Sequence, residues 1–199
     1  MPPSASLHDA TVILDDHPVL RAVSIEIAPG LTLLRGPNGA GKTSLLRALA
    51  GLVPLARGRR DVPAAPLYIG HRPMLLRGLS ARENLAFFAA FRGKRDADVA
   101  GALRRWGVGD VMDRPVDRLS AGQRRRAALA RLDIEREPLV LLDEPFADLD
   151  GEGVLRVRAA IAAAAAHGQA IVLVTHLHEE LDDEAAQLLV MEDGEVRTP

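Results

Sequence analysis

A glycine-rich segment near residue 40 constrains this chain more than any other feature. Residues 36–44 read Gly-Pro-Asn-Gly-Ala-Gly-Lys-Thr-Ser, which matches the pattern of glycine, four residues, then Gly-Lys-Thr. Glycines at these places let backbone N–H groups turn inward and surround phosphate oxygens. A short predicted strand over residues 31–34 precedes the segment, and a helical pattern over 42–50 follows it. This order predicts a phosphate-binding loop, because the helix directs its positive end at the same anion.

Nine residues form this predicted phosphate site: Gly36, Pro37, Asn38, Gly39, Ala40, Gly41, Lys42, Thr43 and Ser44. We expect Lys42 to reach the β- and γ-phosphates of a nucleotide and Thr43 to bind a magnesium ion. Of the 25 basic residues only Lys42 and Lys94 are lysines, so a lysine kept at this place is informative. The alternative is a glycine-rich turn before an ordinary helix.

A pair of acids at the end of an apolar run forms the second motif. Residues 139–142 are Leu-Val-Leu-Leu, as in a strand buried on both faces, and Asp143 and Glu144 follow. We expect Asp143 to hold the magnesium ion, directly or through water. Glu144 would be the general base for an attacking water, a role that contributes roughly 10² to 10⁴ in rate. Alone, the pattern also fits a strand followed by a solvated acidic turn.

The third motif is Leu-Ser-Ala-Gly-Gln over residues 119–123, followed by three arginines. Ser120 and Gly122 open a helix predicted over 121–132, and its start is a second end able to bind phosphate. The alternative is a capped surface helix with a basic face. We expect the arginines at 124–126 to form a solvated face of that helix.

In this order and spacing, GPNGAGKTS, LSAGQRRRAALARL, LLDEPFADLD and the strand ending at Thr175-His176 resemble the ATP-binding subunits of ABC transporters. The resemblance covers residues 10–196. It implies ATP and Mg2+ as ligands and the hydrolysis of ATP. It also implies a head-to-tail homodimer that forms when nucleotide binds. It places Ser120, Gly122 and Gln123 at the nucleotide of the other copy, with Ser120 and Gly122 on its γ-phosphate. His176 would contact the γ-phosphate from its own side, and Asp150 matches the acid that ends the loop linking the two sites.

Two further segments narrow the resemblance. Residues 68–73, Tyr-Ile-Gly-His-Arg-Pro, and residues 79–85, Leu-Ser-Ala-Arg-Glu-Asn-Leu, are similar to the ATP-binding subunit of the cytochrome c maturation system, often called a haem exporter. That similarity implies integral membrane subunits as partners and a peripheral position on the cytoplasmic face of the inner membrane. Two alternatives stay open: a soluble ABC ATPase that acts on DNA or ribosomes, and a regulatory module that binds ATP but turns over little.

One residue departs from the general ABC pattern. His71 stands where most of these subunits have a glutamine that senses magnesium and the attacking water. A histidine could form a hydrogen bond in its place, although its reach differs. The alternative is a loop histidine that contacts neither ligand nor metal.

The order of the predicted elements favours an α/β fold. We expect a P-loop NTPase of the ABC type, with a mainly parallel core sheet, N-terminal antiparallel strands and a helical subdomain over about 74–118, inserted in a single domain that spans 1–199. The predicted strands lie at 11–14, 23–27, 31–34, 67–69, 139–142 and 170–175, with a final hairpin over 190–196. The predicted helices lie at 42–50, from Ser80 to about 111 with a break near Gly93, at 121–132 and at 152–167. Residues 52–66 have the composition of a loop.

Four aromatic residues in the helical region have the spacing of helical core: Phe87, Phe88, Phe91 and Trp106. A docking groove for a partner is the alternative for them.

Composition limits the other functions. The net charge of −2 gives no reason to expect nucleic acid as a partner. The absence of cysteine excludes disulfides and thiol catalysis. The N-terminal residues lack the charged start and apolar core of a signal peptide, and no apolar run approaches the ~18 residues that cross a bilayer.

The N-terminal strands predict weak recognition of the nucleotide base. ABC subunits normally stack an aromatic ring on adenine there, but residues 8–20 contain no Phe, Tyr or Trp, and His17 would stack weakly or serve only as a turn residue. Base–aromatic stacking contributes ~1 to 3 kcal/mol in nucleic-acid complexes. GTP should therefore compete with ATP within about tenfold, ~1.4 kcal/mol. A competition binding assay that shows a strong preference for ATP would reveal an adenine contact missing from this account.

Overall fold

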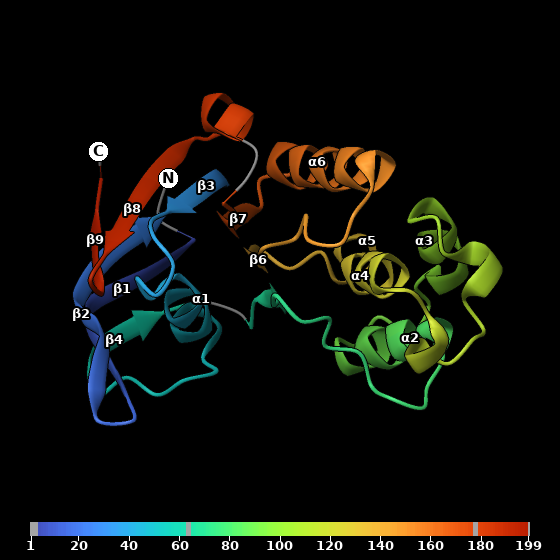
Figure 1. Ribbon diagram of the computed structural model, residues 1–199, viewed down its shortest axis with the longest axis horizontal. Coiled ribbons are helices and arrows are strands. Elements are labelled where there is room, and N and C mark those ends of the chain that lie inside the picture. The colour runs from blue at the N-terminus through green and yellow to red at the C-terminus, as the bar shows by residue number, and fades with distance from the viewer. Residues whose placement is uncertain (1–3, 63–64, 177–178, 199) are drawn as a thin grey trace. The chain divides into compact units, whose positions relative to one another are not determined.

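The structure is a computed structural model that describes residues 4–62, 65–176 and 179–198. The chain divides into two compact units (Figure 1). The first consists of Met1–Tyr68, Glu137–Glu144 and Ala163–Pro199, and the second of Ile69–Arg136 and Pro145–Ala162. The second unit therefore contains the whole of residues 74–118 and extends beyond them on both sides.

A six-stranded sheet forms the centre of the first unit, in the order β5-β6-β7-β3-β8-β9. Its strands are β3 (Gly30–Arg35), β5 (Leu67–Ile69), β6 (Leu139–Asp143), β7 (Ala170–Val174), β8 (Gln187–Glu192) and β9 (Glu195–Arg197). The neighbours β6, β7, β3 and β8 are parallel, and β9 turns back antiparallel to β8. Every residue of β6 and β7 is buried. This confirms the predicted parallel α/β core, whose continuous apolar runs reflect burial on both faces.

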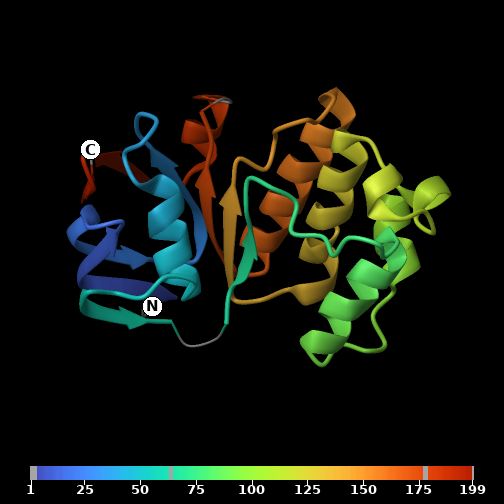
Figure 2. The ribbon, with the colours of Figure 1, turned by 60° about the horizontal axis from the view of Figure 1, so that its bottom comes forward.

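A smaller antiparallel sheet lies beside helix α1 (Lys42–Ala50) in the same unit (Figure 2). Its strands are β1 (Ala5–Leu14), β2 (His17–Ile27) and β4 (Arg57–Asp61), in the order β2-β1-β4. The apolar face of α1, including Leu45, Leu46 and Leu49, packs in one core with residues of both sheets. Gly51 ends α1 with φ +73° and donates its N–H to the Ala48 carbonyl, the left-handed cap that glycine favours.

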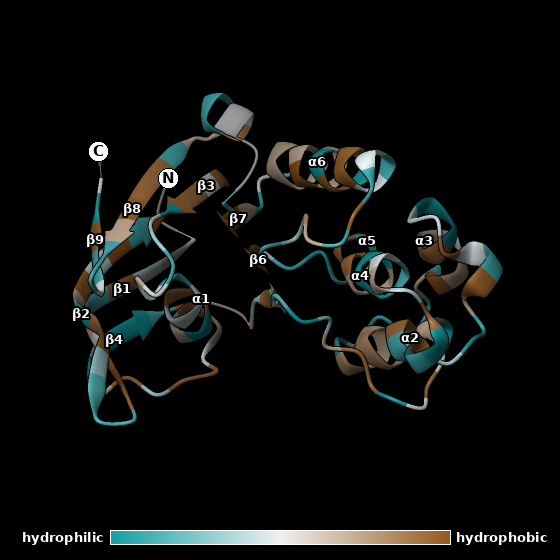
Figure 3. Ribbon diagram, viewed as in Figure 1, coloured by the Kyte–Doolittle hydropathy of each residue, from teal (hydrophilic) through white to brown (hydrophobic). Residues whose placement is uncertain are grey.

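The prediction that residues 52–66 are loop was wrong for β4. All five residues of this strand are exposed, and their sequence, Arg-Gly-Arg-Arg-Asp, is hydrophilic throughout (Figure 3). The strand forms because its backbone pairs antiparallel with β1, for example Leu7 opposite Arg60. Charged residues suit an edge strand, since they oppose pairing with other chains. No alternation of apolar and polar residues was available to predict it.

The second unit is helical. Its helices are α2 (Ala81–Phe91), α3 (Val99–Arg105), α4 (Ala121–Leu129), α5 (Arg131–Glu135) and most of α6 (Gly151–Ala166), with short 3-10 turns at Gly109–Val111 and Val116–Arg118. The predicted start of α2 is confirmed, because Ser80 and Glu83 form a reciprocal capping box. In the part of the chain that the structure describes, no helix is both long and apolar enough to cross a membrane.

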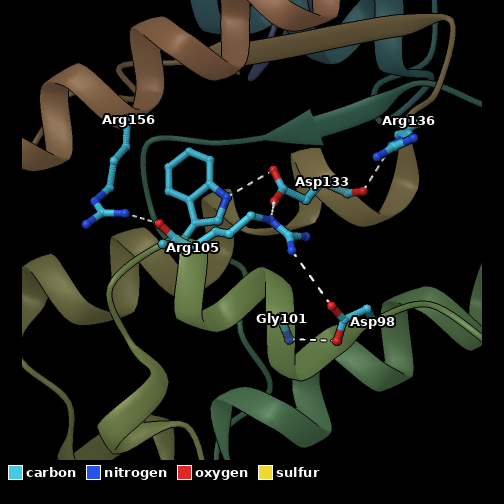
Figure 4. Close-up of polar contacts among 7 residues, drawn as sticks. Asp98, Gly101, Arg105, Asp133, Arg136 and Arg156 are labelled. Carbon is cyan, nitrogen blue, oxygen red and sulfur yellow. Dashed lines mark hydrogen bonds and ion pairs between the residues drawn. The ribbon is translucent and has the colours of Figure 1, made fainter.

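A polar cluster around Asp133 joins α3 to α5 (Figure 4). The buried Trp106 donates its indole N–H to one Asp133 oxygen at 3.2 Å, and Arg105 Nε donates to the other at 2.7 Å. Trp106 is thus core, as its spacing predicted. Its polar N–H is satisfied inside the unit, as a buried tryptophan requires.

The core prediction was wrong for two of the three phenylalanines. Phe87 is 48% exposed and Phe91 76% exposed, while Phe88 is half-buried with the Arg131 guanidinium 3.8 Å above its ring. Helical spacing correctly grouped Phe87 and Phe91 on one face of α2, but that face is not covered within this unit.

A buried carboxylate should be a stability determinant of the helical unit. Glu135 is fully buried and accepts hydrogen bonds from Arg131 Nε at 2.5 Å and Arg92 Nε at 2.9 Å. Glu135→Ala removes the negative charge between two guanidinium groups, so we expect a loss of ~3 to 5 kcal/mol in the free energy of unfolding. Urea denaturation measures this free energy. Glu192→Ala, which changes an exposed residue, is the control and should alter the free energy of unfolding little. A loss below ~1 kcal/mol would show that the pair contributes no net stability.

Candidate functional site

The register of three parallel strands brings the predicted catalytic segments together. Leu34 on β3 and Asp143 on β6 both lie opposite Val174 on β7. The residues that follow each strand therefore leave the sheet at one edge: Gly36, Glu144 and Thr175. Ligands bind at such carboxyl edges of parallel sheets. The phosphate loop, the acid pair and His176 thus belong to one site in the first unit.

The glycine-rich loop has the backbone that a phosphate cradle needs. Gly36 has φ +140°, and a side chain there would meet the Met191 carbonyl oxygen at 2.1 Å, so only glycine fits. Gly41 has φ +108° and precedes the first turn of α1. Lys42 is 6% exposed and its Nζ donates to the Gly36 and Pro37 carbonyls, both at 2.7 Å.

The charge on Lys42 is not fully compensated by its surroundings. Burial lowers the pKa of the Lys42 ammonium group, and the negative charges of Glu144 and Asp143 oppose that shift only in part. A buried cation of this kind gains from an added anion. The loop is therefore suited to a ligand with several negative charges, such as a polyphosphate.

Two oxygen atoms that could bind a metal ion lie together at the start of α1, on Thr43 and Asp143. The Thr43 hydroxyl donates to Asp143 Oδ2 at 2.9 Å, and Asp143 is almost completely buried. Within the described residues no group of three or more His, Cys, Asp or Glu side chains could hold a metal. One carboxylate and one hydroxyl suit Mg2+, which keeps several waters and takes its other ligands from phosphates.

Glu144 is held in an unfavourable backbone conformation. Its φ is +51°, a left-handed value that costs a non-glycine residue roughly 1 to 3 kcal/mol. Its N–H donates to the Val174 carbonyl at 2.9 Å, which fixes this turn to β7. His176 Nε2 lies 3.5 Å from Glu144 Oε1, an oxygen that is buried and has no hydrogen-bond partner among the described residues. Such an acceptor is available for a water molecule.

Arg35 is a residue of this site that the sequence reasoning missed. Its guanidinium donates to the Thr175 carbonyl and to Asp182, both at 2.7 Å. These contacts fix the chain directly before His176. The signal was an arginine at the end of strand β3, after Leu33 and Leu34 and immediately before the phosphate loop.

The other predicted site residues lie in the second unit. Ser120 and Gln123 form a capping box at the start of α4, in which each side chain accepts from the other residue's backbone N–H. A side chain at Gly122 would approach the Asp148 carbonyl oxygen to 2.8 Å, which gives this glycine a packing role. Asp150 accepts from the Gly153 N–H at 2.8 Å and lies 3.6 Å from Arg126. The structure thus gives each of these residues a local contact, and their roles toward nucleotide stay predictions.

The three arginines after Gln123 do not form a solvated face. Arg125 is fully buried and donates to the carbonyls of Gly70 and His71. Arg126 is half-buried beside Asp150, and Arg124 donates to the Leu119 carbonyl. The prediction was wrong because a run of charges carries no periodic signal, and the loop that covers Arg125 is distant in sequence. The His71 side chain itself is exposed.

The strain at Glu144 predicts a difference between two inactive variants. Glycine adopts a left-handed φ without the clash of a Cβ atom, whereas alanine retains that clash. Glu144→Gly should therefore be more stable than Glu144→Ala by ~1 kcal/mol, although both lose the carboxylate. Thermal or urea unfolding of the two proteins gives this difference. Equal stability, or a more stable alanine variant, would mean that the backbone at residue 144 relaxes without cost.

Comparison with known proteins agrees with this geometry. The family described as ABC transporter matches residues 20–147. The cytochrome c biogenesis ATP-binding export protein CcmA of Ruegeria pomeroyi is 44% identical over 169 residues, 84% of this chain and 82% of that protein. The protein of the same description from Xanthomonas axonopodis pv. citri is 41% identical over 187 residues, covering 88% of this chain and 87% of its own.

Solved structures share the fold at lower identity. The ATP-binding subunit of an ABC transporter superposes with a TM-score of 0.86 at 20% identity, covering 98% of this chain and 89% of that chain. A dimeric ATP-binding cassette in a post-hydrolysis state, bound to ADP and Pi, gives a TM-score of 0.86 at 19% identity and covers 98% of both chains. The predicted fold and family are confirmed, and the chain belongs to the ABC transporter family as one of its ATP-binding subunits.

Proposed function

We propose that this chain hydrolyses ATP to drive an exporter of the cytochrome c maturation type. The observation that carries the proposal is the shared sheet edge at which Lys42, Glu144 and His176 meet. The assignment to cytochrome c maturation is supported by relatives described as cytochrome c biogenesis ATP-binding export proteins, which are 41% to 44% identical over most of the chain. A regulatory module with little turnover is disfavoured, since the Glu144 carboxylate and His176 lie 3.5 Å apart at this edge.

The nucleotide phosphates would lie in the loop of residues 36–44. Lys42 would leave the Gly36 and Pro37 carbonyls and bind the β- and γ-phosphates, and the loop amides would hold the same oxygens. Thr43 and Asp143 would hold Mg2+, which when bound would supply positive charge that neutralises the phosphates. Each of these groups positions the phosphates, and positioning with electrostatic stabilisation accounts for most of the catalysis in this class of enzyme.

Glu144 would act as the base. A water molecule held by Glu144 Oε1 attacks the γ-phosphorus, a new P–O bond forms, and the bond to the β–γ bridging oxygen breaks. The water proton passes to the Glu144 carboxylate, and ADP leaves with the electron pair. His176, 3.5 Å from Glu144, would hold the γ-phosphate oxygens in line. Arg35 keeps the backbone before His176 in place.

A complete site would need two copies of the chain facing head to tail. Ser120 and Gly122 belong to the helical unit, and Lys42 belongs to the sheet unit. Both motifs bind phosphate, and we infer that they meet on one γ-phosphate across two chains, with Gln123 and Asp150 nearby. A cassette of the same fold is a dimer in its post-hydrolysis state with ADP and Pi, which supports this arrangement.

Trapping the nucleotide tests the dimer. Glu144→Gln keeps the size of the side chain but removes the base and a negative charge, so we expect ATP binding, turnover reduced by ~10² or more, and a stable dimer with ATP but not with ADP. Light scattering behind a sizing column measures the mass.

Adding Ser120→Arg to this variant supplies the matched control. The new side chain would occupy the place of the partner's phosphate, so the dimer should be lost while ATP still binds the monomer. A Glu144→Gln protein that stays monomeric at saturating ATP, both alone and with its membrane partners, would contradict the proposed dimer.

The exposed apolar residues near His71 would dock the membrane partner. Met74 is 51% and Leu76 41% exposed, and Phe87 and Phe91 are exposed on the adjacent α2. A hollow of about 410 Å³ beside them is lined by three arginines, Arg72, Arg77 and Arg124, and only one acid, Asp117. Apolar side chains rimmed by arginines suit an amphipathic helix with acidic residues. We infer that this surface receives a cytoplasmic helix of an integral membrane subunit at the cytoplasmic face of the inner membrane.

Charge substitutions test this docking surface. Met74→Glu combined with Leu76→Glu should abolish co-purification with the membrane subunits, because burying a carboxylate in an apolar contact is costly. ATP binding by the isolated chain should stay unchanged. Leu52→Glu, on an exposed leucine of the first unit (55% exposed), is the matched control and should leave the complex intact. Retention of the complex in the double variant would place the docking site elsewhere.

A further inference from the structure

Arg125 is a large charged side chain that is fully buried in the described part of the chain. A buried guanidinium is costly unless hydrogen bonds satisfy its donors. It sits in the second turn of α4, five residues after Ser120. Its neighbour Arg124 donates to the Leu119 carbonyl and Arg126 lies beside Asp150, whereas Arg125 contacts a different segment of the unit.

Arg125 reaches the loop that carries His71. Its Nη1 donates to the Gly70 carbonyl at 2.9 Å, and its Nη2 donates to the His71 carbonyl. These two acceptors are consecutive in the chain and follow directly after β5. The planar fork of a guanidinium suits two adjacent acceptors, whereas the single ammonium of lysine binds as a point charge.

The contact links two predicted elements of the nucleotide site. Helix α4 begins at the Ser120 capping box, and a helix is stiff over five residues, which span ~7.5 Å. The hydrogen bonds of Arg125 therefore fix the His71 backbone to the same rigid helix that begins at Ser120 and Gly122. All of these residues lie in the second unit.

We propose that Arg125 is a positioning residue that fixes the His71 backbone to helix α4, so that the helix that begins at the Ser120–Gly122 motif also sets where the His71 side chain lies. The inference rests on the proposed function and on the predicted role of His71 in place of the sensing glutamine. The effect of Arg125 passes through the placement of the His71 ring, whose side chain is exposed while its carbonyl is held.

A double-mutant cycle on the full-length protein tests this proposal. Arg125→Met keeps the length of the side chain and removes the donors. Misplacement of His71 should lower kcat by ~10- to 100-fold, while the Kd for ATP changes less than ~3-fold, since the residues of the phosphate loop lie in the other unit. Residues that act through one another are not additive, so in a His71→Ala background Arg125→Met should lower kcat less than ~2-fold further.

The matched control is Arg131→Met, which removes another buried guanidinium of the helical unit that contacts Glu135 and Phe88. It should lower stability without any coupling to His71. If Arg125→Met fails to show a cooperative melting transition, the same cycle is measured with Arg125→Gln, which keeps an amide donor. Amide hydrogen exchange gives a readout apart from activity: protection of residues 72–76 should fall in the Arg125 variant and not in the Arg131 variant.

Three results would overturn the inference: an unchanged kcat, independent losses in the cycle, or unchanged exchange at 72–76. Failure of the proposed function is distinguishable from these. A wild-type protein that does not hydrolyse ATP, alone or with membrane partners, would refute the function, whereas normal wild-type turnover with an additive cycle refutes only the role of Arg125.

Discussion

The register of β6, β7 and β3 is the constraint on which the rest of this structure depends. Because Leu34, Val174 and Asp143 lie in one row across the sheet, three segments distant in sequence leave it at the same edge. A shift of one residue in a buried parallel strand would turn its side chains to the opposite face and separate Glu144 from His176. The apolar runs that fill these strands therefore do more than build a core, since their packing fixes the spacing of the groups proposed as catalytic.

Two features of the site favour the binding of an anionic ligand and a water molecule. Lys42 is buried with a lowered pKa and folds back on two carbonyls of its own loop, and Glu144 is held at a positive φ by its hydrogen bond to β7. Neither arrangement favours the stability of the free protein. A polyphosphate would supply negative charge that pairs with the Lys42 ammonium group. A water molecule would donate a hydrogen bond to Glu144 Oε1, which has no partner among the described residues. Strain and uncompensated charge of this kind are features that selection for stability alone would remove.

The sequence predicted the elements whose signal is local. The phosphate loop, the buried strands 139–142 and 170–175, the Ser80 capping box and the glycine that ends α1 each carry their own pattern of glycine, apolar run or cap. The misses all depend on distant partners. Strand β4 forms through pairing with β1, and Arg125 is buried by a loop 54 residues away. Phe87 and Phe91 have the apolar spacing of a buried helix face, but no segment of their own unit covers them. The same uncovered face supports the proposed docking surface.

In the proposed dimer, the phosphate loop of one chain and the Ser120–Gly122 motif of another act on one ATP. The absence of cysteine allows a direct measurement. Asn38→Cys and Ala121→Cys, both at exposed positions, are introduced into separate Glu144→Gln chains of different tag length, mixed, and oxidised with ATP or ADP. In the proposed dimer a disulfide should form between residue 38 of one chain and residue 121 of the other, with ATP and not with ADP. Cross-links that form between two copies of the same variant, or that form equally with ADP, would contradict it.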